Sequence, residues 1–493
     1  MNNRAKYETL ALSVLKDLAK ARGIKGITGL KKADVIEAMV KKDEEEEAAA
    51  AAGETAAEAH KETPKAAKET SSRETAAKDT GVPAKETAAK ETTEAGAAGG
   101  ENSGDTDSID ISEDKKILDS GIEASGILEV LSDGYGFIRS ENYMPGENDV
   151  YVAPSQIRRF GLKTGDIITG NTRVKTQADK FGALLFVKTI NGLSPSDHSK
   201  RKNFEDLTPI FPNEKLTLER PGGPVAMRIM DLMCPVGKGQ RGMIVSPPKA
   251  GKTTLLKDVA KSVTRNNPEM HLIILLIDER PEEVTDIKEA IEGPNVEVIY
   301  STFDELPEHH KRVSEMVIER AKRLVEGGKD VIILLDSITR LTRAYNMTVP
   351  PSGRTLSGGL DPAALHMPKR FFGAARNMRE GGSLTVLATA LIETGSKMDD
   401  VVYEEFKGTG NMEMVLDRKL SEKRVFPAID IPKSGTRRED LLLEQEELEA
   451  INVIRKALNG LKADEAVEKV LDMFVRTRSN REFVQMVKKI RFL

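Results

Sequence analysis

The chain has 493 residues, of which 39% are hydrophobic and 31% charged, enough for several domains and a sizeable buried core. No stretch approaches the roughly 18 consecutive apolar residues of a membrane span, and the first residues lack the apolar run of a secretory signal. The single cysteine, Cys234, excludes an internal disulfide. We therefore expect a cytoplasmic protein that does not enter the membrane. The formal net charge is only −5, so any nucleic-acid site has to be a local basic surface.

Residues 1–42 are predicted to form a small helical subdomain. Apolar residues recur at helical spacing on both sides of a glycine-containing turn at 23–29, as at Leu10, Val14 and Leu18. The turn has several basic neighbours, which leaves two interpretations open: a solvated basic face, or a minor nucleic-acid contact.

Residues 43–116 are a low-complexity tract of Ala, Glu, Lys and Thr, with the near-repeats RETAAK and KETAAK and almost no large apolar residue. Such a segment buries too little surface to offset the entropy lost on ordering, so we predict a disordered linker. A tether is the simpler interpretation of its role, and extra RNA contact is the alternative.

Residues 117–193 change to short alternating or apolar runs separated by turn residues, which predicts a small closed β-barrel. Within it, Tyr135 and Phe137 are two residues apart and therefore share a strand face, which Arg139 continues. Exposed aromatic side chains on a barrel of the OB type stack on bases, while an arginine holds phosphate or a base edge. The alternative is that both aromatic residues belong to the core of the sheet.

After a connector at 194–220 that contains several prolines, residues 221–493 alternate strands and helices, the pattern of a parallel α/β sheet. The strongest motif there is the run from Ser246 to Thr254, SPPKAGKTT, between an apolar strand and a helix. This is a phosphate loop: backbone N–H groups face the phosphates of ATP, Lys252 reaches the β- and γ-phosphates, and Thr253 offers its hydroxyl to Mg²⁺. Ser246 replaces the first glycine of the pattern, and an ordinary turn that opens a helix is the alternative.

Two further apolar strands end in acidic residues, Asp278 and Glu279 in one case and Asp336 in the other. Ligands of open α/β sheets bind at these carboxyl ends. Asp336 is the expected Walker B partner of Mg²⁺, and Glu279 is the candidate to deprotonate the attacking water. A lone acid at a strand end is usually a helix cap, but here three elements occur in the order that catalysis needs.

Arg424 and Arg437 lie near the end of this region and offer positive charge for a transition state, a role that arginines commonly fill across a subunit boundary. An exposed arginine is ordinarily solvated surface, and the sequence alone does not select Arg437 for this role.

The chain resembles the family of the bacterial transcription termination factor Rho across nearly everything except the linker. The resemblance rests on ordered stretches such as DGYGFIRS, DVYVAPSQIRRF, PKAGKTTLL, LLIDERPEEVTD, DVIILLDSITRLTRAYN and EKRVFPAIDI. It implies a RecA-like P-loop ATPase core with an OB-fold, cold-shock-like barrel. It also implies a homohexameric, RNA-dependent ATPase and 5′-to-3′ helicase that loads on unstructured, C-rich single-stranded RNA and releases it from the RNA polymerase elongation complex.

The resemblance also implies roles for individual residues. Arg437 is the expected arginine finger from the neighbouring subunit, Arg280 couples the ATP site to the subunit interface, and Phe426 stacks on adenine. Nucleotide contacts are expected from Lys249, Ala250, Gly251, Lys252, Thr253 and Thr254, and contacts of the barrel with RNA from Tyr135, Phe137, Arg139, Asp149, Tyr151 and Phe181.

Two loops are expected to line a central channel, Met347–Leu360 with Arg354 and Thr394–Asp399 with Lys397. Both are expected to follow strands of the core, so that the nucleotide site influences their conformation. The alternatives for the whole chain are a rotary or protein-export ATPase, which needs no such barrel, and an RNA-binding protein with a degenerate ATPase, against which Lys252, Glu279 and Asp336 argue.

Overall fold

The computed structural model describes most of the chain from residue 118 onward and a short N-terminal piece. The described residues are 19, 31–38, 41, 118–175, 180–198, 200–459, 461 and 463–489. The chain divides into two units, Met1–Gly104 and Asp105–Leu493. In the first, residues 32–38 are helical. The predicted linker at 43–116, and most of the predicted helical subdomain at 1–42, lie outside the described residues.

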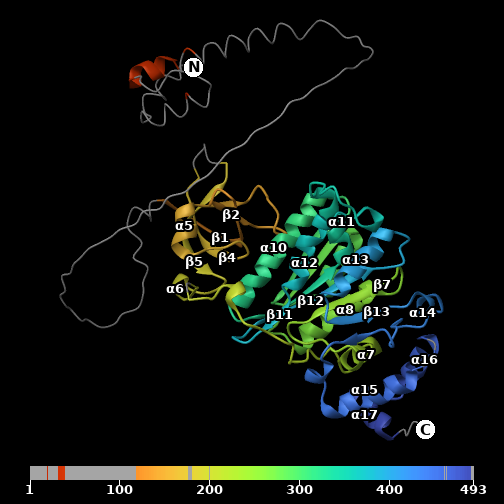
Figure 1. The fold of residues 1–493 in the computed structure, drawn as a ribbon. Helices are drawn as coiled ribbons and strands as arrows, with labels where there is room; N and C mark the ends of the chain where they lie inside the picture. Colours follow the sequence, from red (N-terminus) through yellow and green to blue (C-terminus); the bar gives the residue numbers. More distant parts are fainter. Residues whose placement is uncertain are drawn as a thin grey trace, which may run out of the picture. The chain divides into compact units, whose positions relative to one another are not determined.

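The second unit begins with a closed five-stranded barrel (Figure 1), which confirms the predicted OB-type fold. Its strands pair in the order β1-β2-β3-β5-β4, with β3 and β5 parallel and the other pairs antiparallel. Glycines allow the long first strand to pack closely on its neighbours: a Cβ on Gly126 would lie 2.3 Å from the carbonyl oxygen of Arg139. The bounds are β1 (Asp119–Val130), β2 (Gly136–Arg139), β3 (Val150–Val152), α5 (Pro154–Phe160), β4 (Ile167–Arg173) and β5 (Gly182–Ile190).

A connector leads from the barrel to a mostly parallel sheet, through α6 (Pro195–His198), β6 (Pro209–Ile210) and α7 (Val225–Met233). The sheet order is β14-β13-β7-β12-β10-β8-β9, and β14 pairs antiparallel at one edge. The predicted domain boundaries on either side of the connector, at 193 and 220, stay predictions. The strands are β7 (Arg241–Ser246), β8 (His271–Glu279), β9 (Val296–Thr302), β10 (Asp330–Asp336), β11 (Arg376–Met378), β12 (Ser383–Leu391), β13 (Met412–Val415) and β14 (Gly435–Thr436).

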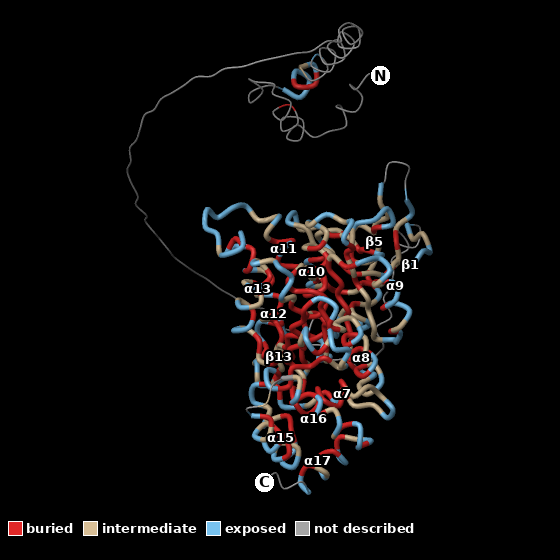
Figure 2. Tube along the Cα trace, turned by 90° about the vertical axis from the view of Figure 1, so that its right-hand side faces the viewer, coloured by how far each residue is buried: buried red, intermediate tan, exposed pale blue. Residues whose placement is uncertain are grey.

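Helices cover both faces of this sheet, which explains why its strands are continuously apolar in sequence. In β8, Leu272 and Ile274 join the core on one face, whereas Ile273 and Leu275 join the core on the other. Figure 2 shows the resulting buried interior flanked by exposed helix surfaces. The helices are α8 (Lys252–Asn266), α9 (Pro281–Ala290), α10 (Pro307–Glu326), α11 (Ile338–Thr348), α12 (His366–Gly373), α13 (Lys397–Lys407) and α14 (Arg418–Glu422).

Three C-terminal helices, α15 (Gln445–Leu458), α16 (Ala463–Val475) and α17 (Asn480–Lys489), gather beside α7 at one end of the core (Figure 1). Their apolar residues continue the core that α7 and α8 form on one face of the sheet. Phe474 and Phe483 stack with ring centroids 3.9 Å apart. The sequence pattern does not distinguish this helical extension from the ATPase region.

The barrel contacts the core at β9, the edge strand of the sheet. The Asn142 side chain donates to the carbonyl oxygen of Tyr300 at 2.7 Å and accepts from its N–H at 3.0 Å. One side chain thus pairs with backbone groups that the edge strand leaves open. Arg201 adds bonds to Asp166 of the barrel at 2.8 Å and to Glu326 of α10 at 3.3 Å.

Candidate nucleotide site and RNA-binding face

The phosphate loop lies where the sequence predicts it, between the end of β7 at Ser246 and the start of α8 at Lys252. Lys249 and Gly251 have left-handed backbones, with φ of 65° and 91°. Gly251 is therefore at a position that favours glycine, immediately before the first residue of the helix. The free N–H groups of this helix start form an anion site of the kind that binds phosphate.

Three predicted catalytic residues come together at this loop. The Lys252 ammonium lies 2.9 Å from Oε1 of Glu279 and 2.5 Å from Oδ1 of Asp336. β8 and β10 are neighbours in the sheet, so their carboxyl ends place the two acids side by side. Both carboxylates are buried.

Burial and mutual charge set the proton affinities of these groups. The pKa of Glu279 is raised above its ordinary value by burial and then by the neighbouring Asp336 carboxylate, against the charges of Lys252 and Arg340. Burial alone would lower the pKa of Lys252, but Asp336 and Glu279 outweigh it and raise that pKa. The site therefore holds a lysine that stays charged beside a carboxylate with increased basicity.

The structure adds three residues that sequence analysis missed. Arg340 donates to the backbone carbonyl of Asp278 and lies 3.2 Å from Oε2 of Glu279. Thr389 of β12 donates to Oδ1 of Asp336 at 2.8 Å, and Glu283 of α9 accepts from Thr253 at 3.4 Å. Only Arg340 had a sequence signal, because it lies in the first turn of the helix that follows Asp336.

The Thr253 hydroxyl and the Asp336 carboxylate are hard oxygen donors close to the phosphate loop, so they fit Mg²⁺. Among the described residues, no group of three or more His, Cys, Asp or Glu forms a separate metal site.

A mostly apolar cavity of about 560 Å³ adjoins the loop and is suited to a base. Phe426 is half exposed at its wall, and a Cβ on Gly251 would lie 3.9 Å from the Phe426 ring. Arg424, two residues earlier, is exposed and has a left-handed backbone. The other predicted nucleotide contacts that line the cavity are Lys249, Ala250, Gly251 and Thr254.

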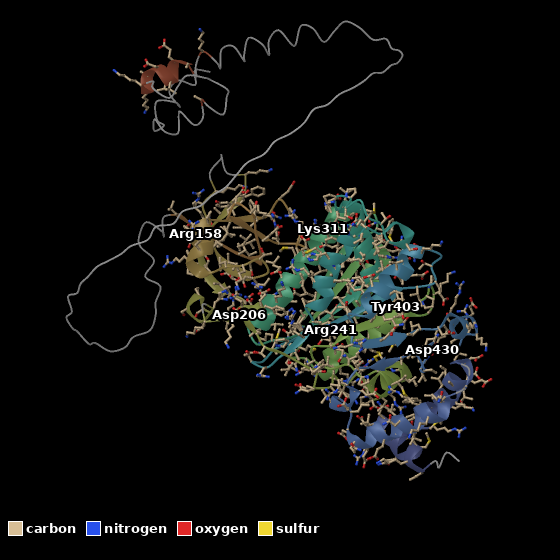
Figure 3. All side chains as sticks on the ribbon, in the orientation of Figure 1. Arg158, Asp206, Arg241, Lys311, Tyr403 and Asp430 are labelled. Atoms are coloured by element: carbon tan, nitrogen blue, oxygen red, sulfur yellow. The ribbon has the colours of Figure 1, made fainter. Side chains whose placement is uncertain are left out.

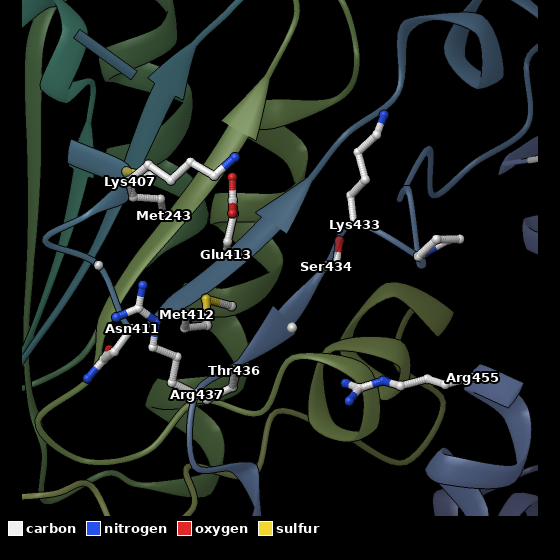
Figure 4. A pocket seen from close by; sticks show the side chains of 13 residues that line it. Met243, Lys407, Asn411, Met412, Glu413, Lys433, Ser434, Thr436, Arg437 and Arg455 are labelled. Atoms are coloured by element: carbon white, nitrogen blue, oxygen red, sulfur yellow. The ribbon is translucent and has the colours of Figure 1, made fainter. Parts of the chain in front are cut away.

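Arg437 lies at the opposite end of the sheet from the phosphate loop of its own chain. Its backbone N–H donates to the carbonyl oxygen of Asn411, and the Asn411 N–H donates to the carbonyl oxygen of Arg241 at the start of β7. The five steps from the first to the last residue of β7 separate that end from the loop by about 16 Å, at about 3.3 Å per residue. Figure 4 shows Arg437 beside Asn411 in a cavity of about 400 Å³ that Arg455 also lines.

Arg280 is also outside the Lys252 cluster. Its side chain is 66% exposed and pairs with Glu283 at 3.1 Å. It is therefore accessible on the surface next to the catalytic acid rather than inside the site.

Four aromatic residues of the predicted RNA-binding face cluster on the barrel. The ring centroid of Phe137 lies 5.9 Å from those of Tyr135 and Tyr151 and 5.2 Å from that of Phe181. None of these rings belongs to the hydrophobic core cluster of the barrel, so the alternative of a core role does not describe them. Residues 176–179, just before Phe181, lie outside the described part of the chain.

Arg139 and Asp149 border this cluster and are both buried. The Arg139 guanidinium lies 4.9 Å from the Phe137 ring centroid and bonds both Asp149 and Glu129, so it is more enclosed than sequence analysis expected. Within the described residues, Oδ1 of Asp149 is buried without a hydrogen-bond partner. A buried carboxylate oxygen without a partner costs free energy, so a ligand donor that reached it would be favoured.

The two predicted channel loops contact each other. A Cβ on Gly358 would lie 2.5 Å from the backbone nitrogen of Met398. Arg354 and Lys397 are both exposed, and Lys397 is already the first residue of α13. The expectation that both loops follow strands is wrong for Met347–Leu360, which follows helix α11 because the chain continues from β10 through that helix.

Two family models match the chain. Residues 124–196 match the RNA-binding domain of Rho termination factor, and residues 226–436 match the nucleotide-binding domain of the ATP synthase alpha/beta family. Among the described residues, no helix is long and apolar enough to cross a membrane.

Curated relatives named transcription termination factor Rho are similar over most of their length. The one from Pseudomonas aeruginosa is 56% identical over 382 residues, which are 76% of this chain and 90% of the relative. That from Bacillus subtilis is 56% identical over 363 residues, 73% of this chain and 84% of the relative. That from Aquifex aeolicus is 55% identical over 381 residues, 75% of this chain and 87% of the relative.

Proposed function

This chain belongs to the transcription termination factor Rho family, and on that premise we propose that it acts as a homohexamer that moves 5′ to 3′ along nascent RNA and releases it from RNA polymerase. It is an ATP-hydrolysing enzyme with an RNA-binding domain. One observation supports the proposal best: a single unit of the chain contains both the Lys252–Glu279–Asp336 cluster and a barrel with an aromatic face.

In the proposed reaction, water attacks the γ-phosphorus of ATP and the bond to the β–γ bridging oxygen breaks. Glu279 accepts the proton of the water, and Lys252 moves from the carboxylates to the β- and γ-phosphates. Arg340 holds Glu279 in position through its contact at 3.2 Å. Mg²⁺, held by Thr253 and Asp336, would neutralise phosphate charge.

Arg437 is proposed to act on the ATP site of the neighbouring subunit, because it lies too far from its own phosphate loop. A guanidinium that approaches the γ-phosphate from the next subunit stabilises the charge that develops in the transition state. Hydrolysis would then change the contacts at the subunit boundary, where Arg280 is exposed beside Glu279. Arg424 is proposed to support the same boundary, and Phe426 to stack on adenine.

The barrel is proposed to bind unstructured, C-rich RNA. The rings of Tyr135, Phe137, Tyr151 and Phe181 offer stacking surfaces for bases, worth about 1–3 kcal/mol each. The unpartnered Oδ1 of Asp149 would accept from the exocyclic amino group of cytosine, which uracil lacks. Arg354 and Lys397, on two loops that contact each other, would grip the RNA backbone in the channel.

The first test is steady-state ATP hydrolysis with and without poly(C), for the wild type and for Glu279→Ala. We expect strong stimulation in the wild type and no turnover in the variant. A second arm measures transcript release from a stalled elongation complex. Vigorous turnover that no RNA affects would favour a rotary or export ATPase, and RNA-stimulated turnover without transcript release would contradict the termination role alone.

A further inference from the structure

Four charged side chains form a continuous network from the RNA-binding face of the barrel to helix α10 of the core. Glu129 is at its centre. Its carboxylate lies 2.6 Å from Nη2 of Arg139 on the barrel and 2.7 Å from Nη2 of Arg312 on α10. Arg139 in turn bonds Asp149, so the network reaches the aromatic rings.

The charges of this network balance only when α10 contributes. The barrel supplies two carboxylates, Glu129 and Asp149, but a single guanidinium, Arg139. Arg312 provides the second positive charge. Without it, an excess negative charge would lie in a largely buried position that Arg139 links to the aromatic rings, the face proposed to bind polyanionic RNA. Coulomb interactions are stronger in such a position than in water.

We infer that Arg312 is a positioning residue for RNA binding, which makes the RNA affinity of the barrel depend on its contact with the ATPase core. The inference rests on the proposed function. Arg312 acts through Glu129: by sharing that carboxylate, it reduces the net negative charge of the network that borders the aromatic rings. Because coupling between two equilibria is reciprocal, RNA bound at the barrel strengthens the contact with α10 by the same factor.

This role is separable from folding. Arg312 has a 36% exposed side chain and lines a cavity of about 610 Å³ between the 140–148 segment and the core. The barrel remains attached through Asn142 and Arg201 when Arg312 is changed. Its neighbour Lys311 is visible on the same helix in Figure 3.

Helix α10 also leads toward the catalytic site. It packs against α11, and Tyr345 of α11 donates to Glu315 of α10 at 2.9 Å. Arg340, which contacts Glu279, lies five residues earlier on α11. The element that receives Glu129 is therefore adjacent to the helix that positions the catalytic acid.

The test measures binding of a fluorescein-labelled oligocytidylate to the full chain at fixed salt, by anisotropy. Arg312→Gln should weaken binding by about tenfold, equivalent to about 1.4 kcal/mol. Arg312→Lys should restore most of it. Arg265→Gln, which removes an exposed arginine from α8, is the matched control and should leave affinity unchanged.

The sharpest arm is the double variant. Glu129→Gln combined with Arg312→Gln removes one charge of each sign, so binding should return to within about twofold of the wild type, a coupling that a double-mutant cycle isolates. In RNA-stimulated hydrolysis, Arg312→Gln should raise the RNA concentration for half-maximal activity and leave kcat unchanged.

Equal binding by the wild type and Arg312→Gln would overturn the inference, as would a double variant as weak as Arg312→Gln. A wild type that binds no oligocytidylate would refute the proposed function itself, and the inference with it.

Discussion

At the scale of single residues, the chemistry depends on Glu279, whose carboxylate is buried between Lys252 and Arg340. Glu279→Gln keeps the shape of the side chain but cannot accept a proton. We expect hydrolysis to fall by about 10²–10⁴-fold, the usual contribution of a general base, with nucleotide binding retained. Single-turnover hydrolysis and nucleotide titration check this, with the exposed Glu269→Gln as control. Comparable turnover in Glu279→Gln would remove the residue from the mechanism.

Arg340 predicts a pH effect with a definite sign. Its positive charge lowers the pKa of Glu279, which burial and Asp336 raise. Glu279 works only when ionised, so activity should fall as pH decreases through that pKa, above the range of an ordinary glutamate. Arg340→Ala removes the charge that lowers the pKa of Glu279, so the acid limb of the kcat profile should move to higher pH. Arg340→Lys keeps the charge and should return the acid limb toward its position in the wild type. An acid limb at the same pH in all three proteins would contradict this coupling.

Arg437 is tested by mixing subunits, since it lies about 16 Å along the sheet from its own phosphate loop, at about 3.3 Å per residue. Arg437→Ala and Lys252→Ala should each be inactive alone. Mixed assemblies should regain partial hydrolysis, because some boundaries combine an intact loop with an intact arginine. Activity that does not recover in any mixing ratio would indicate that Arg437 acts within its own chain.

At the scale of elements, the contact between the two channel loops offers a matched pair of glycines. Gly358 and Gly359 both have left-handed backbones, with φ of 79° and 80°. A Cβ on Gly358 would lie 2.5 Å from the backbone of Met398, whereas one on Gly359 meets nothing within 4 Å. Both alanine variants therefore carry the same backbone strain, about 1–2 kcal/mol, and only one displaces the second loop.

We expect Gly358→Ala to reduce RNA-stimulated turnover severalfold and to leave RNA-independent turnover unchanged. Gly359→Ala should resemble the wild type. Hydrolysis assays with and without RNA distinguish the two effects. Equal loss in both variants would mean that backbone strain, and not the contact between loops, limits activity.

At the scale of the whole molecule, Cys234 reports on the integrity of the core. Its thiol is completely buried after α7, and burial raises its pKa to about 12. Because the thiolate is the reactive form, the native chain should not react with a thiol reagent at neutral pH. One thiol per chain should react in denaturant, and ATP should slow the reaction by stabilising the folded state. Rapid labelling of the native chain would show that this side of the core opens readily.

The sequence by itself determined the elements whose signals are local. The phosphate loop, the apolar strands that end at Glu279 and Asp336, and the alternating strands of the barrel follow from residue order, because period and turn chemistry act over a few neighbours. The motif stretches also identified the family. The roles of Arg424, Phe426 and the RNA-contacting residues remain predictions of this kind.

Only the tertiary structure decided which distant residues meet. Arg340, Thr389 and Glu283 join the catalytic cluster from three different elements, and for Thr389 and Glu283 no spacing in the sequence indicates that. Arg139 is enclosed rather than exposed because Glu129 and Asp149 approach it from neighbouring strands. Arg312 completes that network from 183 residues away. The burial of a side chain and the balance of charge around it depend on its neighbours in three dimensions. The order of residues predicts strands and loops, but these two properties are set only when the elements pack together.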